Sequence, residues 1–242
     1  MVVILISANA EWEVVCDYFP QQTYFQSPYG EWFYYPPIGY PCREYPSKEN
    51  PHPWILFHGG WGKISAAGST QYVIDRWHPK LLINLGTCGG FAGKINRFQT
   101  VLADRTVVYD IYEQMGDPEA HTNFYTTRLE SDWFFRELPH PVQIGTLVSA
   151  DRDLFPEQLP GLLEKYQARA GDWESGAIAF IAHRNQIEPV ILRGVTDLVG
   201  VEGGEAYQNN TLYIETTKIV MKNLLDQLPD WIFFILGNMP SD

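Results

Sequence analysis

A short apolar run passes directly into a glycine turn at Leu81-Leu82-Ile83-Asn84-Leu85-Gly86-Thr87-Cys88-Gly89-Gly90. Its apolar residues do not alternate with polar ones, which is typical of a strand covered on both faces. In α/β folds, a tight glycine turn after such a strand places backbone N–H groups at the carboxyl edge of the sheet. This stretch therefore predicts a buried strand that ends at the edge of an α/β sheet.

Similar runs recur along the chain. Apolar or β-branched segments occupy residues 2–7, 54–57, 101–103, 144–150 and 190–195, and helical patterns occupy residues 10–19, 63–77, 173–184 and about 207–228. Because strands and helices alternate, we expect a single doubly wound α/β domain that spans residues 1–242.

The two ends of the chain are apolar. Residues 1–6 have no basic residue before them, so we expect a first buried strand rather than a signal peptide. Residues 231–236 are too few to span a bilayer, which needs about 20 apolar residues. We expect a late strand or a packing tail there.

A proline-rich insertion interrupts the alternation at residues 20–53, which hold eight of the 17 prolines and many aromatic residues. Proline at this density stops regular helix and confines strands to short edges. We expect a surface hairpin packed by its own aromatic side chains, and the alternatives are an oligomer contact or a lid.

The composition excludes several classes of protein. With 242 residues, 45% hydrophobic and 19% charged, the chain is neither a disulfide-stapled miniprotein nor globally disordered. A net charge of −12 disfavours nucleic acids and anionic membranes as partners. Three cysteines without CxxC spacing suit a reducing compartment, and we expect the cytoplasm.

Catalysis, if present, is expected from carboxylates. The six histidines and three cysteines show no metal-ligand spacing, so we expect neither a metal nor a cofactor. No Walker A loop or GxSxG elbow is present. Glu13, Glu174 and Asp197 each fall at the end of a strand or the start of a following helix. In a doubly wound sheet these ends converge on one crevice.

Six motifs occur in an order that resembles a known family: Ser7-Ala8 with Glu13-Val14, Gly60-Trp61-Gly62-Lys63, Asn84 to Gly90, Val148-Ser149-Ala150-Asp151, Trp173 to Ala179, and Arg193-Gly194-Val195-Thr196-Asp197. The chain is similar to the purine nucleoside phosphorylase/nucleosidase superfamily, and most of all to its 5′-methylthioadenosine/S-adenosylhomocysteine nucleosidase branch. The resemblance extends from Val2 to about Leu228. It implies a three-layer domain with a central mixed, largely parallel sheet flanked by helices.

The resemblance also implies a chemistry for the carboxylates. The N-glycosidic bond of a purine nucleoside breaks through an oxocarbenium-like transition state, and the leaving purine needs a proton. Asp197 matches the acid that serves N7. Glu174 matches the residue that accepts the ribose 2′- and 3′-hydroxyls. Glu13 matches the base for the attacking water, and a shift in register would give that role to Glu11.

Further positions match substrate-binding residues of the family. Thr87 and Arg193 match residues that hold the nucleophile, beside Cys88 and Gly89 of the glycine turn. Trp173 stands where the family often has Met. Tyr207 matches an aromatic near the 5′ end of the nucleoside. Asp153 takes the place of an aromatic that stacks on the base, so that Leu154 and Phe155 are the remaining candidates for base binding.

Water is the expected nucleophile, because the hexameric phosphorylases carry phosphate-binding arginines where this chain has Asn84 and Ser7-Ala8-Asn9-Ala10. The expected function is therefore hydrolysis of a purine nucleoside to free base and a ribose derivative. The resemblance also implies a homodimer. A phosphorylase and a non-catalytic nucleoside-binding protein are the alternatives. The purine nucleoside and its 5′ substituent stay open.

Overall fold

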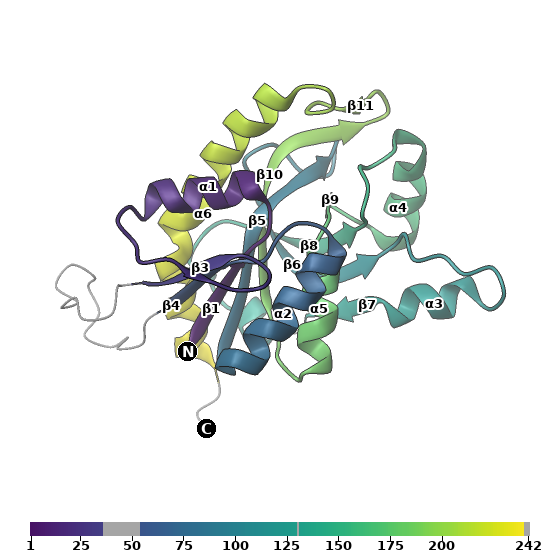
Figure 1. Cartoon of the computed structure of the whole chain (residues 1–242). Helices are drawn as coiled ribbons and strands as arrows, with labels where there is room; N and C mark the ends of the chain where they lie inside the picture. The colour runs from purple at the N-terminus through teal and green to yellow at the C-terminus, as the bar shows by residue number, and fades with distance from the viewer. Residues whose placement is uncertain (36–53, 130, 240–242) are drawn as a thin grey trace.

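A computed structural model describes residues 1–35, 54–129 and 131–239 of the chain (Figure 1). A mixed sheet forms its centre, and helices cover the sheet on both faces. The strands are β1 (Val2–Ile6), β2 (Phe25–Gln26), β3 (Glu31–Tyr35), β4 (Trp54–His58), β5 (Leu81–Phe91), β6 (Thr100–Val108), β7 (Thr126–Arg128), β8 (Gln143–Ser149), β9 (Ala170–Asp172), β10 (Val190–Gly200) and β11 (Gly203–Gly204).

Five strands of this sheet close on themselves. β5 pairs with β10, β10 with β6, β6 with β8, β8 with β9, and β9 with β5. We call this group the strand ring. From β5 the sheet continues as an open wing through β1, β4, β3 and β2. The pairs β1–β4, β1–β5, β5–β10, β6–β8 and β8–β9 are parallel, which agrees with the expected mixed sheet.

The helices divide between the two faces of the sheet. α1 (Asn9–Tyr18) and the long α6 (Asn210–Asn238) pack together on one face, and α2 (Lys63–Trp77) and α5 (Ser175–Arg184) pack together on the other. The shorter helices are α3 (Pro118–Phe124) and α4 (Leu159–Tyr166), and 3₁₀ turns lie at Asp132–Phe135 and Pro156–Gln158. The three expected layers are therefore present.

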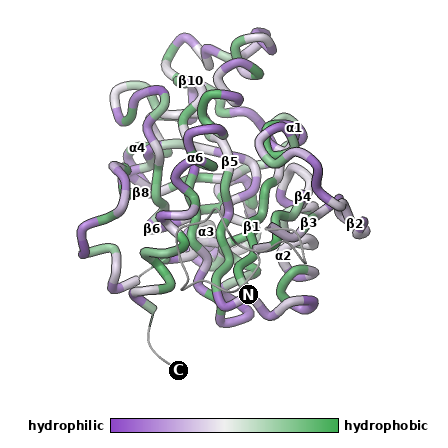
Figure 2. Tube along the Cα trace, turned by 90° about the vertical axis from the view of Figure 1, so that its left-hand side faces the viewer, coloured by the Kyte–Doolittle hydropathy of each residue, from purple (hydrophilic) through white to green (hydrophobic). Residues whose placement is uncertain are grey.

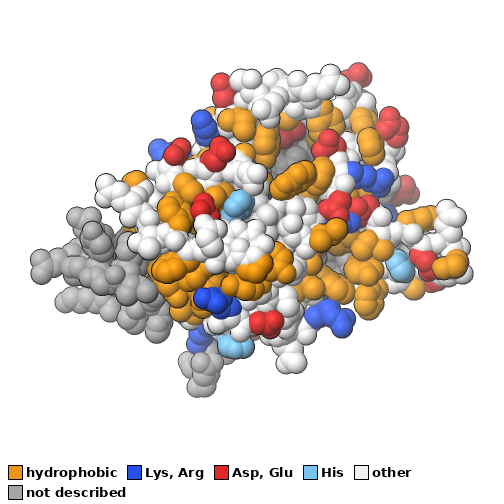
Figure 3. Space-filling model, in the orientation of Figure 1, with side chains coloured by type: hydrophobic (Ala, Val, Ile, Leu, Met, Phe, Trp, Pro, Cys, Tyr) orange, Lys and Arg blue, Asp and Glu red, His pale blue; other side chains and the backbone are white. Residues whose placement is uncertain are grey.

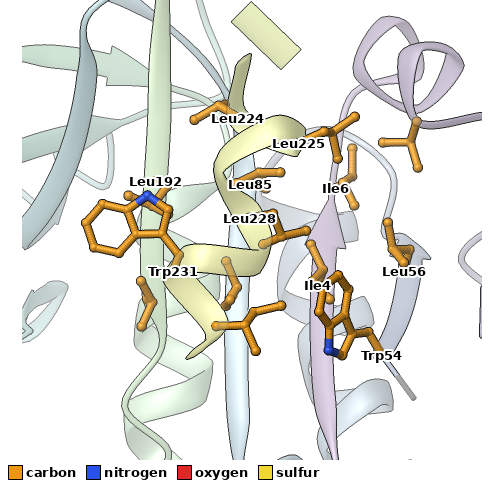
Figure 4. Packing of buried hydrophobic residues seen from close by; sticks show 14 of the residues in the cluster. Ile4, Ile6, Trp54, Leu56, Leu85, Leu192, Leu224, Leu225, Leu228 and Trp231 are labelled. Atoms are coloured by element: carbon orange, nitrogen blue, oxygen red, sulfur yellow. The ribbon is translucent and has the colours of Figure 1, made fainter. Parts of the chain in front are cut away.

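Strand β1 shows why the sheet needs cover on both sides. Ile4 and Ile6 face the cluster around α6, together with Leu224 and Leu228 (Figure 4). Val3 and Leu5 face the opposite cluster, beneath α2 and α5. Successive side chains of a strand point to opposite faces, so an uninterrupted apolar run is buried only between two layers. Figure 2 shows this arrangement: the strands at the centre are hydrophobic, and the helices around them have polar stretches.

Of the two alternatives for residues 231–236, the strand is wrong, and the segment packs against the core as part of a helix. Residues 231–236 belong to α6, which continues through Pro229 to Asn238. Trp231, Ile232 and Ile235 are completely buried, so tertiary packing compensates for the hydrogen bond that proline removes. Among the described residues, no helix has the length and hydrophobicity needed to cross a bilayer.

Part of the proline-rich insertion is described and forms the β2–β3 hairpin. The Phe33 ring lies 5.8 Å from Trp12, 5.9 Å from Phe19 and 5.5 Å from Tyr24, measured between ring centroids. Residues 36–53 of the predicted insertion, including Cys42, lie outside the described residues.

Candidate active site

A cavity of about 730 Å³ opens at the carboxyl ends of β5 and β10, towards the top of Figure 1. Ligand cavities of small-molecule enzymes have this size. Eight of the predicted site residues line it: Thr87, Cys88, Gly89, Leu154, Trp173, Glu174, Asp197 and Tyr207. The cavity therefore brings together residues that lie more than a hundred positions apart in the sequence.

Glu11 is a buried carboxylate on the cavity wall, with 1% of its surface exposed. The backbone N–H and the hydroxyl of Thr87 both donate to its Oε1, over 2.6 and 2.8 Å. The backbone N–H of Ala8 donates to Oε2 over 3.1 Å, at the start of α1. Three donors thus fix the carboxylate beside the glycine-rich part of β5.

Glu13 was expected to face the cavity, and this prediction is wrong. Its side chain is exposed and lies outside the cavity lining. Residues two apart on a helix point in nearly opposite directions, so α1 can present only one of Glu11 and Glu13 to the sheet. Glu11 lies three and four positions before the buried Val14 and Val15, which places it on the buried face.

Arg193 lies behind the cavity wall rather than on its surface. Its guanidinium is fully buried and lies 3.0 Å from Asp172, 3.4 Å from Glu174 and 3.7 Å from Glu11, measured between nitrogen and carboxylate oxygen. Its NH2 nitrogen also donates to Oδ1 of Asn84 over 2.8 Å. One buried cation therefore holds three buried carboxylates.

Gly86 makes this close packing possible. A Cβ at this position would collide with the Arg193 guanidinium and would lie 2.8 Å from Oε1 of Glu11. Register pairing places Gly86 opposite Arg193 in the parallel β5–β10 ladder. The glycine at this position of β5 is thus required by the site that the strand helps to build.

Asp172 is a member of the site that the sequence did not identify. Its Oδ1 accepts the Ser149 hydroxyl over 2.6 Å and the Ser175 backbone N–H over 3.1 Å. The Ser175 hydroxyl donates to the other oxygen, which also pairs with Arg193. Asp172 directly precedes Trp173 and Glu174, but only the fold shows that it is buried with the arginine.

Glu174 is held from the side of α2. The backbone N–H of Gly62 donates to its Oε1 over 3.0 Å. Gly62 has a φ of 82°, a left-handed conformation that favours glycine. The next residue, Lys63, donates its backbone N–H to Asp151 over 2.7 Å, and its ammonium pairs with Asp110. Burial raises the pKa of Glu174 to about 8, and Asp172 and Glu11 add to the shift, whereas Arg193 opposes it.

Asp197 lies elsewhere on the cavity wall, at a register shift in β10. The Thr196 hydroxyl donates to its Oδ1 over 2.8 Å, and the Ala206 backbone N–H also donates to the carboxylate. Burial raises the pKa of Asp197 above the usual value, although these two hydrogen bonds oppose the shift. A carboxyl with a raised pKa can carry a proton to a ligand.

Aromatic residues line two other parts of the cavity. Trp61 and Trp173 have ring centroids 5.3 Å apart. The hydroxyl of Tyr207 donates to the Leu154 backbone carbonyl over 2.8 Å, which fixes the tyrosine beside the segment that follows β8. Tyr213 of α6 also lines the cavity and had not been identified from the sequence.

Phe155 does not replace the missing stacking aromatic. It is 47% exposed and lies outside the cavity lining, and its ring is covered by the Arg152 guanidinium at 5.7 Å. Asp153 occupies the lining position instead, beside Leu154. The expectation for Phe155 is therefore corrected. In the described part of the chain, no cluster of three or more His, Cys, Asp or Glu side chains has metal-binding geometry.

Comparisons with known proteins point to one superfamily. Residues 17–226 match the model of the phosphorylase superfamily. A 5′-methylthioadenosine/S-adenosylhomocysteine nucleosidase of Tolumonas auensis is 25% identical over 179 residues, which cover 69% of this chain and 78% of that protein. The nucleosidase of Bacillus thuringiensis is 25% identical over 187 residues, or 72% and 81% of the two chains.

Solved structures show the same fold. The structure of Arabidopsis thaliana 5′-methylthioadenosine nucleosidase superposes with a TM-score of 0.77 at 22% identity and covers 98% of this chain and 96% of its own. The Neisseria meningitidis nucleosidase in complex with methylthio-immucillin-A gives a TM-score of 0.67 at 18% identity, with 92% and 94% covered. The match of the superfamily model to most of the chain shows that this protein belongs to the phosphorylase superfamily.

Proposed function

We propose that this protein hydrolyses the N-glycosidic bond of purine nucleosides of the 5′-methylthioadenosine/S-adenosylhomocysteine type and releases free base and a ribose derivative. The chain is an enzyme, a nucleosidase. The observation that carries the proposal is the placement of three buried carboxylates, Glu11, Glu174 and Asp197, around one cavity of nucleoside size. Relatives named as nucleosidases of this type support it.

Asp197 is the general acid. As the bond between C1′ and N9 breaks, negative charge develops on the purine, and a proton delivered to N7 neutralises it. The raised pKa of Asp197 keeps a larger fraction of this carboxyl protonated near neutral pH than an exposed aspartate would have. Leu154, Tyr207, Cys88 and Gly89 form the nearby walls against which the base packs.

Glu174 anchors the sugar. Its carboxyl group forms hydrogen bonds with the 2′- and 3′-hydroxyls, and the Gly62 N–H and Arg193 orient its two oxygens. Trp173 supplies an apolar surface beside it.

Glu11 is the general base. It takes a proton from the attacking water, while the Thr87 side chain holds the carboxylate in place. Arg193 is a positioning residue, because its guanidinium is buried behind Glu11 and Glu174 and does not reach the cavity surface. Its positive charge partly offsets the burial that raises the pKa of Glu174.

Water is favoured over phosphate as the nucleophile by the charge of the cavity. Glu11, Asp153, Asp172, Glu174 and Asp197 line it, and in the described residues the cationic lining is limited to Arg152. Arg152 belongs to the segment after β8, and its guanidinium lies over the ring of Tyr109. A phosphate dianion would meet this excess of negative charge with few charge-assisted donors.

The test is to incubate the protein with a panel of purine nucleosides in phosphate-free buffer and to measure free base and reducing sugar. We expect base release at a rate that phosphate does not change. A tenfold acceleration by phosphate, worth about 1.4 kcal/mol of barrier, together with a sugar-1-phosphate product, would identify a phosphorylase. Binding of nucleosides without any base release would identify a non-catalytic member.

The assembly and compartment belong to the same proposal. Several apolar side chains near α2, α3 and the entrance to the cavity are exposed, among them Trp61 at 59%, Ile64 at 86%, Tyr112 at 70% and Met115 at 95% (Figure 3). Exposed apolar surface of this kind favours a homodimer interface. The odd number of cysteines, with Cys16 and Cys88 free, favours the reducing cytoplasm.

A further inference from the structure

A second cavity of about 680 Å³ lies away from the candidate active site. It is formed by β6, β7 and the ends of α3, α4 and α5, on the right of Figure 1. His183 on its wall lies eight residues after Ser175 in α5, which corresponds to about 12 Å along the helix. The two cavities therefore use opposite ends of α5, and none of the residues lining one lines the other.

The lining of the second cavity is basic in a chain of net charge −12. Arg105, Arg128 and Lys165 line it together with His183, and Glu119 is the carboxylate among the lining residues. Arg105 and Arg128 are direct partners in the antiparallel β6–β7 ladder. Like charges at directly opposed positions of a ladder repel each other and cost stability.

Arg105 is held in place by two hydrogen bonds. Its Nε donates to the Thr146 hydroxyl over 3.0 Å, and its NH2 nitrogen donates to the Tyr166 backbone carbonyl. Both acceptors are neutral, so these two bonds fix Arg105 without neutralising its charge. The neighbouring Asp104 carboxylate interacts electrostatically with both Arg105 and Arg128. The bond to Tyr166 also brings the guanidinium next to Lys165, whose ammonium lies 5.4 Å from the centre of the Tyr166 ring.

Within the described residues, neither Arg105 nor Lys165 forms an ion pair with a carboxylate. The cavity thus holds cations from two strands and one helix, together with polar groups such as Thr127 and Asn123. An anion with several acceptor oxygens would relieve the repulsion and engage several donors at once.

We propose that this cavity is a binding site for a small phosphate-bearing molecule, separate from the nucleoside site. A phosphate group carries close to two negative charges at neutral pH and three acceptor oxygens, which matches clustered cations better than a single carboxylate does. The volume exceeds that of a phosphate ion and leaves room for an organic part.

The test uses the full chain and inorganic pyrophosphate as the probe, in metal-free buffer of constant ionic strength, with binding measured by isothermal titration calorimetry. We expect saturable binding and a rise in Tm, because a ligand that binds only the folded state stabilises it. Lys165→Ala should weaken binding about tenfold. Lys222→Ala, an exposed lysine on α6, is the matched control and should leave binding unchanged.

Two further variants make the result decisive. Glu119→Gln removes the carboxylate from the lining and should strengthen binding severalfold, a gain that misfolding cannot produce. Arg152→Ala removes the cation from the candidate active site and should have no effect. The proposal is overturned if pyrophosphate gives no saturable heat at millimolar concentration, or if Arg152→Ala abolishes binding while Lys165→Ala does not.

Discussion

Thr87 donates both its backbone N–H and its side-chain hydroxyl to the same oxygen of Glu11, over 2.6 and 2.8 Å. The two residues are 76 positions apart, and the contact joins the start of α1 to the glycine-rich part of β5. It places a buried carboxylate at the mouth of a cavity and fixes its orientation before any ligand enters.

This contact makes Glu11 the carboxylate to test. Glu11→Gln should lower kcat by about 10²–10⁴-fold, because an amide cannot accept the proton of the attacking water. Glu13→Gln changes an exposed residue of the same helix and is the matched control, with activity near wild type. Steady-state release of free base measures both. A damaging Glu13→Gln with a silent Glu11→Gln would reverse the assignment.

Asp197→Asn should reduce base release by about 10²–10⁴-fold and leave nucleoside binding within a few-fold of wild type. The amide keeps the shape of the side chain and can still donate a hydrogen bond, but it delivers no proton. Calorimetric binding of a nucleoside together with kcat separates the two effects. Activity within a few-fold of wild type would exclude Asp197 as the acid.

The raised pKa of Glu174, about 8 in the folded protein, predicts a pH dependence of stability. Between the ordinary glutamate pKa and pH 8, the unfolded chain is ionised at this residue while the folded chain holds the proton. Folding therefore binds a proton, and the contribution of this group to stability falls as pH rises through that interval. Glu174→Gln removes the titration.

The measurement is the difference in Tm between Glu174→Gln and wild type, followed from about pH 5 to pH 8. We expect the difference to shift in favour of the variant as pH rises. A difference that is constant with pH would show that Glu174 keeps an ordinary pKa in the folded state.

Light scattering tests the assembly. At micromolar concentration we expect twice the 27.7 kDa mass of one chain, because exposed apolar side chains such as Ile64 and Met115 are then covered. Replacing Ile64, which is 86% exposed, by a charged residue should shift the equilibrium towards the monomer without loss of secondary structure. A wild-type protein that stays monomeric would remove the dimer from the proposal.

Much of the fold follows from short-range sequence patterns. The strand predicted at residues 81–85 is found, since an uninterrupted apolar run needs cover on both faces. The glycine turn predicted after it is wrong: β5 continues through Gly86 and Gly90 to Phe91, because β10 pairs with it along this stretch. The closure of β5 and β10 into the strand ring was not predicted, because strand pairing depends on contacts between distant residues. Proline disfavours the interior of a helix, so Pro229 favoured an end to the last helix at residue 228. The helix continues to Asn238 because burial of Trp231 outweighs this local preference.

The sequence predicts a site residue only where its position along a helix or strand determines which way its side chain points. Glu174 and Asp197 were predicted from their places near the ends of strands, and both line the cavity, after β9 and near the carboxyl end of β10. Glu11 was distinguishable from Glu13 by its spacing to Val14 and Val15, which is a helical signal. The burial of Asp172 with Arg193 had no comparable signal, because it depends on three-dimensional packing between strands and a helix.

The strand ring and the outer strands of the sheet should also differ in how readily they open locally. Along the stretch that carries Gly86, β5 pairs with β10 on one side, and on the other side it pairs with β1 only at residues 81–84 and with β9 only at residues 89–90. In β10, residues 192–194 are paired with β5 on one side and with β6 on the other, so the backbone amides around Arg193 lie inside the sheet. Their hydrogens should exchange with deuterium only when the whole chain unfolds, whereas the outer β2–β3 hairpin can open alone. The scaffold of the carboxylates is thus the slowest-exchanging part of the protein, and the nucleoside must enter through the loops and helix ends around it.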